Sequence, residues 1–278
     1  MNPTNTISVN KLAGTRILVI GGTSGIGFAV ARAALEHGAN VFLASSQASK
    51  VDDALTRLRT LYPDPGSQSR IAGGCACNLG DPATLETHVR GLLEQATTTT
   101  TSTATEKTLL DHIVYTAGDA LGLKPVTDPT LTVADIHAAG TVRVLGALMV
   151  AKHARSYMRV SARSSITFTS GVNGHRPARG WALAAASGGA VEGMARGLAV
   201  DLAPVRVNTV SPGAVLTELF DNFGDEEAKL AAVERYAEET LVGEIGRPEE
   251  VAEAYVYLMK DRFVTGTLVH SEGGKLLK

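Results

Sequence analysis

This chain of 278 residues has few cysteines, a small net charge and no long apolar run. Its two cysteines, Cys75 and Cys77, would point to the same face of a strand, and no second Cys or His pair stands near enough to complete a zinc site. We therefore expect two small buried thiols and no metal. A formal net charge of -2 gives no general basic field that would hold nucleic acid or an acidic membrane.

Targeting and membrane signals are also missing. The first residues lack the apolar segment of a signal peptide, and no run of roughly 18 apolar residues occurs. Nothing in the cysteine usage demands an oxidising compartment. These absences predict a cytoplasmic protein without a nucleic-acid or membrane partner. The composition, with 44% hydrophobic and 19% charged residues, is ordinary for a soluble enzyme.

Short apolar runs alternate with helical patterns along residues 14–278. Strands are predicted at 16–22, 40–46, 70–79, 111–118, 164–171, 206–213 and 266–274. Helices are predicted at 28–39, 50–62, 82–95, 132–158, 182–202, 225–241 and 247–260. This alternation predicts an α/β protein with a single-domain Rossmann fold, in which helices cover both faces of a doubly wound parallel sheet.

Two segments do not fit the alternation. Residues 1–13 are polar, and we expect a flexible N-terminal arm. Residues 96–107 are a Thr-rich, low-complexity stretch with nothing to bury, and we expect a mobile surface insertion there. The alternation resumes directly after it, so it is not a domain boundary.

A glycine-rich turn, "GGTSGIG", follows the first strand and opens a helix. Glycine is needed there because the backbone turns sharply and must approach a pyrophosphate without a Cβ in the way. The helix N-terminus then points free N–H groups and a positive dipole end at the phosphates. The sequence therefore predicts a dinucleotide site, with contacts from Gly21, Thr23, Ser24, Gly25, Ile26 and Gly27.

The end of the second strand selects the cofactor. A carboxylate there would bind a ribose 2′-hydroxyl and repel a 2′-phosphate. This chain instead has Ser45 and Ser46, with Lys50 just beyond, so NADP(H) is favoured over NAD(H). A helix cap and turn is an alternative role for the two serines and is compatible with this one. Asn78 and Leu79, after the third strand, are expected at the adenine.

Several further motifs follow in a recognisable order: "YTAG" (115–118), "TSG" (169–171), "VRVNTVSPG" (205–213) and "EGG" (272–274). With the G-x-x-x-G-x-G spacing of the turn, they resemble the short-chain dehydrogenase/reductase (SDR) family over nearly all of residues 14–274. The resemblance implies further cofactor contacts from Ala117, Gly118, Pro212, Gly213, Val215 and Thr217. It also implies a homo-oligomer paired through the helices at 132–158 and 182–202, although small residues there equally suit packing on the sheet.

Typical SDR enzymes use a Tyr, a Lys, a Ser and an Asn. Aligning on "SGGAVEG" puts Ala184 at the Tyr position and Gly188 at the Lys position, and the helix motif puts Arg143 at the Asn position. Ser170 alone remains. Since neither Ala nor Gly can donate a proton near neutral pH, we do not expect an ordinary carbonyl reductase. Hydride transfer to an iminium needs no such acid.

The stretch "HRPARGWALAA" (175–185) contains the single tryptophan, Trp181, three residues before the emptied Tyr position. It resembles a Pro-Asp-Pro-Gly-Trp stretch in a fungal SDR subgroup, the reductase/Diels–Alderases of malbrancheamide- and paraherquamide-type alkaloid pathways. Pro177, Gly180 and Trp181 match, whereas Ala178 and Arg179 replace the Asp and the second Pro. The resemblance implies NADPH reduction of a cyclic iminium in a small-molecule substrate, followed by an intramolecular [4+2] cycloaddition.

We therefore expect catalytic roles for Arg143, Ser170 and Trp181. Trp181 equally fits a core position, and the partner of Arg143 is either a substrate oxygen or a carboxylate of the protein. His175, Arg176 and Arg179 either line the mouth of the site or are solvated loop charges. Two alternatives remain open for the whole chain: a non-redox cyclase or isomerase with structural NADP(H), and an inactive nucleotide-binding homologue.

Overall fold

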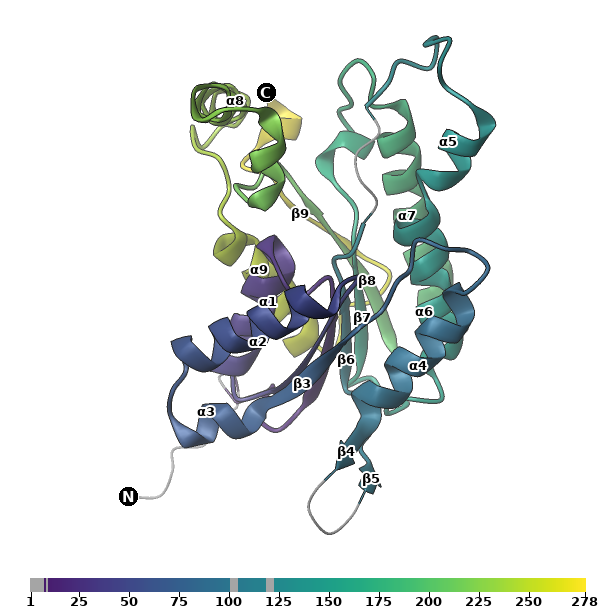
Figure 1. Cartoon of the computed structure of the whole chain (residues 1–278), viewed down its shortest axis with the longest axis vertical. Helices are drawn as coiled ribbons and strands as arrows, with labels where there is room; N and C mark the ends of the chain where they lie inside the picture. Colours follow the sequence, from purple (N-terminus) through teal and green to yellow (C-terminus); the bar gives the residue numbers. More distant parts are fainter. Residues whose placement is uncertain (1–7, 9, 101–104, 119–122) are drawn as a thin grey trace.

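Seven parallel strands form one sheet in the order β3-β2-β1-β6-β7-β8-β9 (Figure 1). The computed structural model describes residues 8, 10–100, 105–118 and 123–278. The strands are β1 (Arg16–Ile20), β2 (Asn40–Ser45), β3 (Ile71–Ala76), β6 (His112–Tyr115), β7 (Ser165–Thr169), β8 (Arg206–Pro212) and β9 (Leu268–Ser271). The predicted doubly wound α/β fold is confirmed.

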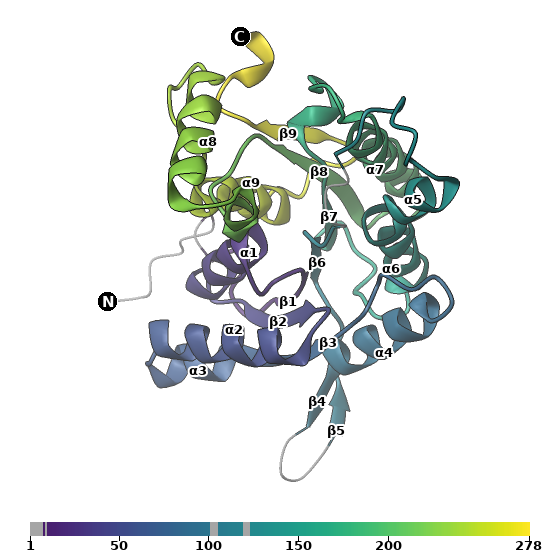
Figure 2. The same ribbon diagram turned by 45° about the horizontal axis from the view of Figure 1, so that its top comes forward.

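Helices cover both faces of the sheet (Figure 2). One face carries α1 (Gly25–Glu36), α2 (Ala48–Leu61) and α9 (Pro248–Lys260), and the other carries α4 (Leu85–Thr97), α6 (Ala147–Ala154) and α7 (Ala182–Asp201). Each layer buries its own apolar cluster, one around Val30 and Val41 and the other around Val89 and Phe168. Other helical segments are α3 (Pro65–Arg70), α5 (Val133–Ala138), α8 (Glu226–Glu238) and the short turns η2 (Val172–Gly174), η3 (Glu218–Phe223) and η4 (Lys275–Leu277).

The strand order fixes where a ligand can bind. β1 lies between β2 and β6, so the chain order reverses at the boundary between β1 and β6. In open parallel sheets the crevice beyond the carboxyl ends of the strands at such a point is the usual ligand site. The fold therefore brings the ends of β1, β2, β6, β7 and β8 to one edge.

The long helix predicted at 132–158 is divided into three pieces. After α5 the chain breaks at Gly140 and forms a π-helical turn, η1 (Thr141–Gly146), before α6 begins. The Tyr115 hydroxyl donates to the Val142 carbonyl inside that turn at 2.5 Å. By length and composition alone, the stretch Val133–Ala154 could cross a membrane, with a mean hydropathy of 1.4. Core helices also meet that criterion, and the buried side of α6 packs on the sheet.

The two segments outside the predicted alternation have ordered parts. Residues 1–7 and 9 of the expected arm lie outside the described residues, but Leu12 is buried in the first apolar cluster. The Thr-rich stretch begins within α4, and β4 (Thr98–Thr100) pairs antiparallel with β5 (Thr105–Lys107) in a hairpin that projects from the body (Figure 1). The Arg16 guanidinium donates to the Ala96 carbonyl at 2.7 Å. The ends of the stretch are therefore regular structure, and residues 101–104 lie outside the description.

The two cysteines are free thiols at the end of β3. Cys77 is buried, whereas Cys75 is only half-buried. Burial raises the pKa of the Cys75 thiol to about 11 and that of Cys77 to about 12. Since the thiolate is the reactive form, both side chains act as small apolar groups at neutral pH.

Acid sensitivity is built into the core at His112. This side chain is buried on β6, where its Nδ1 lies 2.8 Å from Ser165 Oγ, and burial lowers its pKa from 6.5 to about 3. The unfolded chain binds this proton near pH 6.5 and the folded chain does not, so the free energy of unfolding falls as the pH drops from about 6.5 toward 3. Urea denaturation at a series of pH values measures this dependence. For His112→Asn, the free energy of unfolding should fall less steeply with decreasing pH than for the wild-type protein, whereas His137→Asn, a change at an exposed histidine, should leave the slope unchanged. Equal slopes in the wild-type protein and both variants would contradict this prediction.

Candidate functional site

The glycine turn after β1 is folded tightly against the end of β6. Gly21 and Gly25 have φ angles of +86° and +47°, in the region that favours glycine. A Cβ on Gly21 would lie 2.6 Å from the Ala117 nitrogen, and a Cβ on Gly27 would overlap the Gly21 carbonyl oxygen. The turn therefore needs glycine at these positions, and the N-terminus of α1 is left facing the crevice. Ser24 makes no capping bond there with its side chain.

The other expected cofactor residues lie along the same edge, at or just beyond the ends of β2, β3, β6 and β8. They are Ser45, Ser46, Asn78, Leu79, Ala117, Gly118, Pro212, Gly213, Val215 and Thr217. Thr23 Oγ1 donates to Ser45 Oγ at 3.1 Å, which ties the glycine turn to β2. Asn78 is exposed. The Leu79 side chain, in contrast, is buried in the second apolar cluster and packs with the core.

Thr116 is a site residue that the sequence reasoning did not single out. Its hydroxyl lies 3.1 Å from the Ile20 carbonyl oxygen and 3.2 Å from that of Gly21, so it holds the glycine turn to β6. The signal was its place inside "YTAG", directly after a buried strand. Its role is to position the turn.

The emptied catalytic positions lie on α7, opposite the end of β7. Ser170 directly follows β7 and is 6% exposed. Ala184 is half-buried and Gly188 is buried. A Cβ on Gly188 would have the Gly174 Cα, 4.0 Å away, as its nearest neighbour. The short turn η2 therefore packs against α7 where a lysine side chain would otherwise begin.

Arg143 lies on the π-helical turn η1 and reaches the end of β6. A Cβ on Gly118 would overlap its guanidinium, so the Arg143 side chain lies directly against the Gly118 backbone. Its positive charge also acts on the buried Tyr255 hydroxyl, whose pKa is raised by burial and lowered in smaller part by Arg143. The fold thus brings Arg143 next to an expected cofactor residue, in the crevice.

Trp181 stands at the N-cap of α7, directly after Gly180, whose φ is +87°. The Trp181 nitrogen donates to the Ala178 carbonyl at 3.1 Å, which closes a tight turn. The indole is half-buried. This partial exposure is compatible with a contact to a ligand and places Trp181 outside the two buried apolar clusters.

A hydrogen-bonded cluster that the sequence reasoning missed adjoins Ser170. Ser170 Oγ donates to Glu192 Oε1 at 2.9 Å, and His175 Nε2 lies 3.0 Å from the same oxygen. The His175 ring packs edge-on against His270, with centroids 5.0 Å apart. Glu192 follows Gly188 by four residues, so both lie on one face of α7, and this spacing was the available signal.

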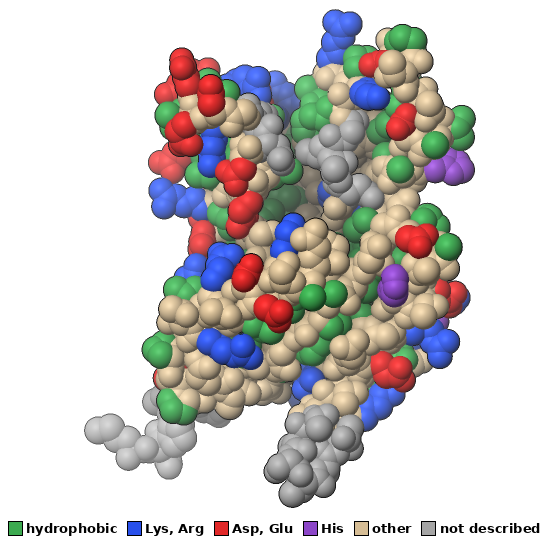
Figure 3. Space-filling view, in the orientation of Figure 1, with side chains coloured by type: hydrophobic (Ala, Val, Ile, Leu, Met, Phe, Trp, Pro, Cys, Tyr) green, Lys and Arg blue, Asp and Glu red, His purple; other side chains and the backbone are tan. Residues whose placement is uncertain are grey.

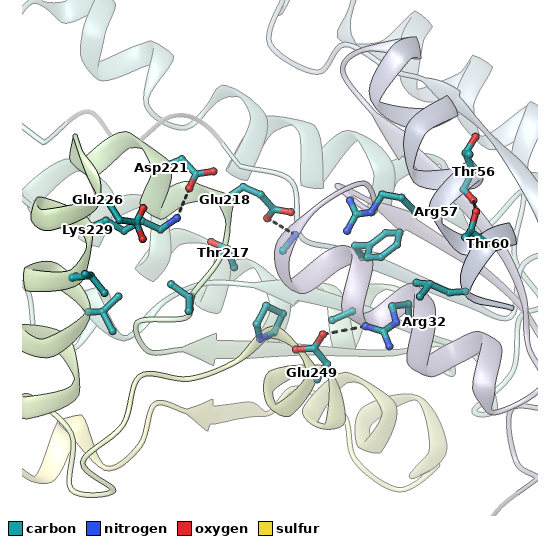
Figure 4. A pocket seen from close by; sticks show the side chains of 18 residues that line it. Arg32, Thr56, Arg57, Thr60, Thr217, Glu218, Asp221, Glu226, Lys229 and Glu249 are labelled. Atoms are coloured by element: carbon teal, nitrogen blue, oxygen red, sulfur yellow. Dashed lines mark hydrogen bonds and ion pairs between the residues drawn. The ribbon is translucent and has the colours of Figure 1, made fainter.

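A groove of about 940 Å³ runs along the outer side of α1, between α2, η3, α8 and α9 (Figure 4). It shares Gly25 with the glycine turn, and Thr217 and Glu218, which contact Gly25, also line it. Glu218 Oε2 accepts a hydrogen bond from the Gly25 nitrogen at 2.9 Å, drawn as a dashed line in Figure 4. A carboxylate of the protein therefore binds the N–H group expected to receive a phosphate. A separate recess lies between the part carrying α8 and the part carrying α5 and α7 (Figure 3).

Known proteins share both this sequence and this architecture. A family model of the SDR-like Rossmann domain matches residues 8–278. The short-chain dehydrogenase/reductase malC of Malbranchea aurantiaca is 39% identical over 271 residues, covering 98% of each chain, and ucsE of Acremonium sp is 40% identical over 272 residues, covering 98% of this chain and 99% of its own.

Solved structures agree with the sequence comparisons. The MalC reductase/Diels-Alderase from Malbranchea aurantiaca superposes with a TM-score of 0.88 at 39% identity, covering 99% of this chain and 100% of that one. A small-chain dehydrogenase in complex with NADPH gives a TM-score of 0.72 at 26% identity, covering 95% of this chain and 100% of its own. The resemblance inferred from the motifs is confirmed: this chain belongs to the short-chain dehydrogenase/reductase family, with an SDR-like Rossmann domain.

Proposed function

We propose that this protein is an NADP(H)-dependent oxidoreductase that transfers hydride to a cyclic imine or iminium in a bulky biosynthetic intermediate. The observation that supports the proposal is a tight glycine turn at the carboxyl edge of the sheet, beside a candidate site in which Ser170 alone matches the family's Tyr, Lys, Ser and Asn. A site of this kind can position a reducible carbon over a nicotinamide without supplying a phenolic acid. Substrates that are already cationic fit such a site best.

The residues present fit NADP(H). Gly21 and Gly27 allow the backbone to approach a pyrophosphate, and the α1 N-terminus presents N–H groups to it. The end of β2 carries Ser45 and Ser46 and no carboxylate, which suits a 2′-phosphate. When bound, the cofactor supplies the hydride. The protein's own residues hold it and orient the substrate.

The absence of an acid at the family's positions favours a C=N substrate over a ketone. Ala184 and Gly188 have no proton to give, and the nearby Tyr255 hydroxyl is fully buried with a raised pKa and bonded to Thr169 Oγ1 at 2.6 Å. An iminium carbon accepts hydride without protonation, whereas a ketone oxygen must be protonated as it forms an alkoxide. Arg143 and Trp181 would orient the substrate from two sides of the crevice.

Ring closure is the second part of the proposal. The similar MalC protein is named a reductase/Diels-Alderase, and this chain has a Gly180–Trp181 turn at the start of α7, so we infer that it also guides a stereocontrolled intramolecular [4+2] cyclisation. Ala178 stands at the place of that subgroup's Asp, so any cyclisation here proceeds without a carboxylate at this position. Shape and orientation would have to supply the rate enhancement.

The test uses N-methyl-3,4-dihydroisoquinolinium, a permanently cationic iminium, with purified protein and NADPH. We expect loss of NADPH absorbance above the uncatalysed rate, and a decrease of about tenfold or more in kcat/KM for Arg143→Ala and Trp181→Ala. No turnover above background would overturn the reductase proposal. Conversion of a cyclisable substrate at the same rate with NADP+ as with NADPH would favour a cyclase with a structural cofactor.

Glu218 should weaken cofactor binding because its carboxylate takes the Gly25 N–H group that a pyrophosphate would use. Glu218→Gln removes the negative charge at nearly constant size, and we expect NADPH to bind about two- to fivefold more tightly. Fluorescence titration with NADPH measures the effect. The control is Glu226→Gln, which removes another groove carboxylate; among the described residues Glu226 makes no hydrogen bond to the glycine turn. An equal gain in affinity in both variants, or no gain in Glu218→Gln, would contradict the prediction.

We also propose that the protein forms a homo-oligomer, acts in the cytoplasm on a small-molecule substrate and binds no nucleic acid. Support for the assembly comes from α7, where Gly189 and Gly197 are exposed and have no neighbour within 4 Å of an added Cβ. Val200 on the same helix is also exposed. Light scattering of the purified protein tests the assembly.

A further inference from the structure

A carboxylate buried beside Ser170 is the feature from which this inference starts. The Glu192 side chain is 9% exposed, and its Oε1 is bonded to both Ser170 and His175. Within the part of the chain that the structure describes, His175 is its one ion-pair partner. Burying a carboxylate is costly unless it is paired and hydrogen-bonded. Its place in the catalytic centre therefore calls for a chemical explanation.

The turn η2 packs on α7 beside this carboxylate. Gly188 lies one helical turn before Glu192, and a Cβ on it would have the Gly174 Cα of η2, 4.0 Å away, as its nearest neighbour. A Cβ on Gly174 would lie 3.9 Å from Glu192 Oε1, so η2 and the carboxylate are in ordinary van der Waals range. The turn then presents His175 to the carboxylate. The Glu–His pair therefore stands next to the helix position where Gly188 replaces the family's lysine.

Exposure increases along the cluster from Ser170 to His175. Ser170 is 6% exposed and the Glu192 side chain 9%, whereas the His175 side chain is 35% exposed. Histidine is the side chain that most readily gains and loses a proton near neutral pH. The hydrogen bonds therefore connect solvent at His175 to the serine in the crevice.

A neighbouring hydroxyl adds a second polar group to the same face of the sheet. Thr169 pairs with Val210, so Ser170, directly after β7, comes beside Ser211 on β8. Ser211 in turn pairs with His270 on β9. Ser211 Oγ is buried and, like the hydroxyls of Ser164, Thr167 and Thr209, has no hydrogen-bond partner among the described residues. Unlike those three hydroxyls, it stands in register with His270, which packs on His175.

We propose that His175 and Glu192 form a proton relay that delivers a proton from solvent, through Ser170, to the nitrogen of a neutral imine. The inference rests on the proposed reductase function and extends its substrates from preformed iminium ions to imines. Protonated His175 gives its proton to Glu192 Oε1, and the carboxyl passes it to Ser170 Oγ while Ser170 gives its own proton to the imine nitrogen. The two transfers share one carboxylate oxygen, so no rotation of Glu192 is needed.

The reaction is balanced because the cofactor supplies the hydride and solvent supplies the proton. The protonated imine carbon accepts hydride from NADPH, which leaves an amine and NADP+, and His175 regains its proton from solvent. The hydrogen bond from Ser170 to Glu192 also explains why the serine releases its proton to the substrate only after Glu192 is protonated. While Glu192 is ionised, the serine hydrogen points at the carboxylate; once Glu192 is protonated, it donates to the serine and frees that hydrogen for the substrate.

The experiment compares two substrates that differ by one methyl group, 2,3,3-trimethyl-3H-indole and 1,2,3,3-tetramethyl-3H-indolium, near pH 7, where the first, a weak base, is neutral and a histidine can still be protonated. Only the neutral imine needs a proton. For Glu192→Gln, we expect the ratio of kcat for the imine to kcat for the iminium to fall by about 100-fold. Gln keeps an oxygen that accepts from Ser170 but cannot carry the proton. Asp201→Asn, a carboxylate change at the end of the same helix, is the control and should leave the ratio unchanged.

A second variant keeps the proposal testable if Glu192→Gln does not fold. His175→Ala should lower the same ratio, and added imidazole should restore turnover of the imine, which a merely structural role would not produce. An unchanged ratio in a folded variant would show that the cluster only braces α7, and the relay would be overturned while the reductase stands. Failure of the wild-type protein to reduce either substrate would overturn the reductase, and the relay with it.

Discussion

Substitution of Gly27 by alanine is expected to weaken NADPH binding by about 10- to 100-fold. The added Cβ would overlap the Gly21 carbonyl oxygen and lie 2.5 Å from Thr116 Oγ1. Both groups hold the glycine turn to the sheet, so α1 would have to move away from the phosphate position. Overpacking of this kind costs about 1–3 kcal/mol, and each 1.4 kcal/mol is about tenfold in affinity.

Isothermal titration with NADPH measures this loss. The matched control is Gly91→Ala on α4, where an added Cβ meets nothing within 4 Å. Alanine at a helical position without a clash should stabilise the protein by about 1 kcal/mol and leave NADPH affinity unchanged. If Gly27→Ala binds NADPH as tightly as the wild-type protein, the glycine turn is not the phosphate site.

Replacement of Arg206 by leucine is expected to lower the free energy of unfolding by about 3–5 kcal/mol. This arginine is 3% exposed on β8, and burial lowers its pKa to about 10. Its guanidinium donates to four carbonyl oxygens, those of Ala162, Leu258, Met259 and Val264, at 2.7 to 3.1 Å. Two of these belong to the last turn of α9, whose carbonyls have no partner within the helix.

Leucine would leave those carbonyl groups buried without a donor, and an unpaired buried polar group is costly. Urea denaturation followed by circular dichroism measures the change. Arg159→Leu is the control, since that side chain is 55% exposed and pairs with Asp111 at the surface; it should cost less than about 1 kcal/mol. Similar losses of unfolding free energy in the two variants would show that burial does not increase the stabilising effect of the Arg206 hydrogen bonds.

Most of the fold was predictable because its signals are local. "RILVI" is a wholly buried strand in the middle of the sheet, and the apolar spacing of α1 and α9 matches the faces that they bury. The glycine turn was also readable, since strand, glycines and helix follow each other without interruption. The loss of the family's acid could be inferred in the same way, from the residues that stand at two motif positions.

Local signals failed where a distant contact overrides them. The apolar pattern at 132–158 predicts one helix, but the π-helical turn η1 interrupts it, with Tyr115 from β6 bonded to its Val142 carbonyl. The Thr-rich stretch has no apolar pattern, yet Arg16 from β1 bonds to the chain where that stretch begins. In both cases the segment is hydrogen-bonded to a polar side chain far away in the sequence, a contact that no local pattern can reveal.

The sequence by itself determined the individual strands, the glycine turn and the lack of tyrosine and lysine at the family's motif positions, since each depends on neighbours along the chain. The tertiary structure alone placed Glu218 on the Gly25 nitrogen, 193 residues away, and Arg143 against Gly118. It also joined Ser170, Glu192 and His175, which belong to a strand end, a helix and a turn. Hydrogen bonds act over about 3 Å, so such partners are fixed by strand register and helix packing and not by sequence spacing.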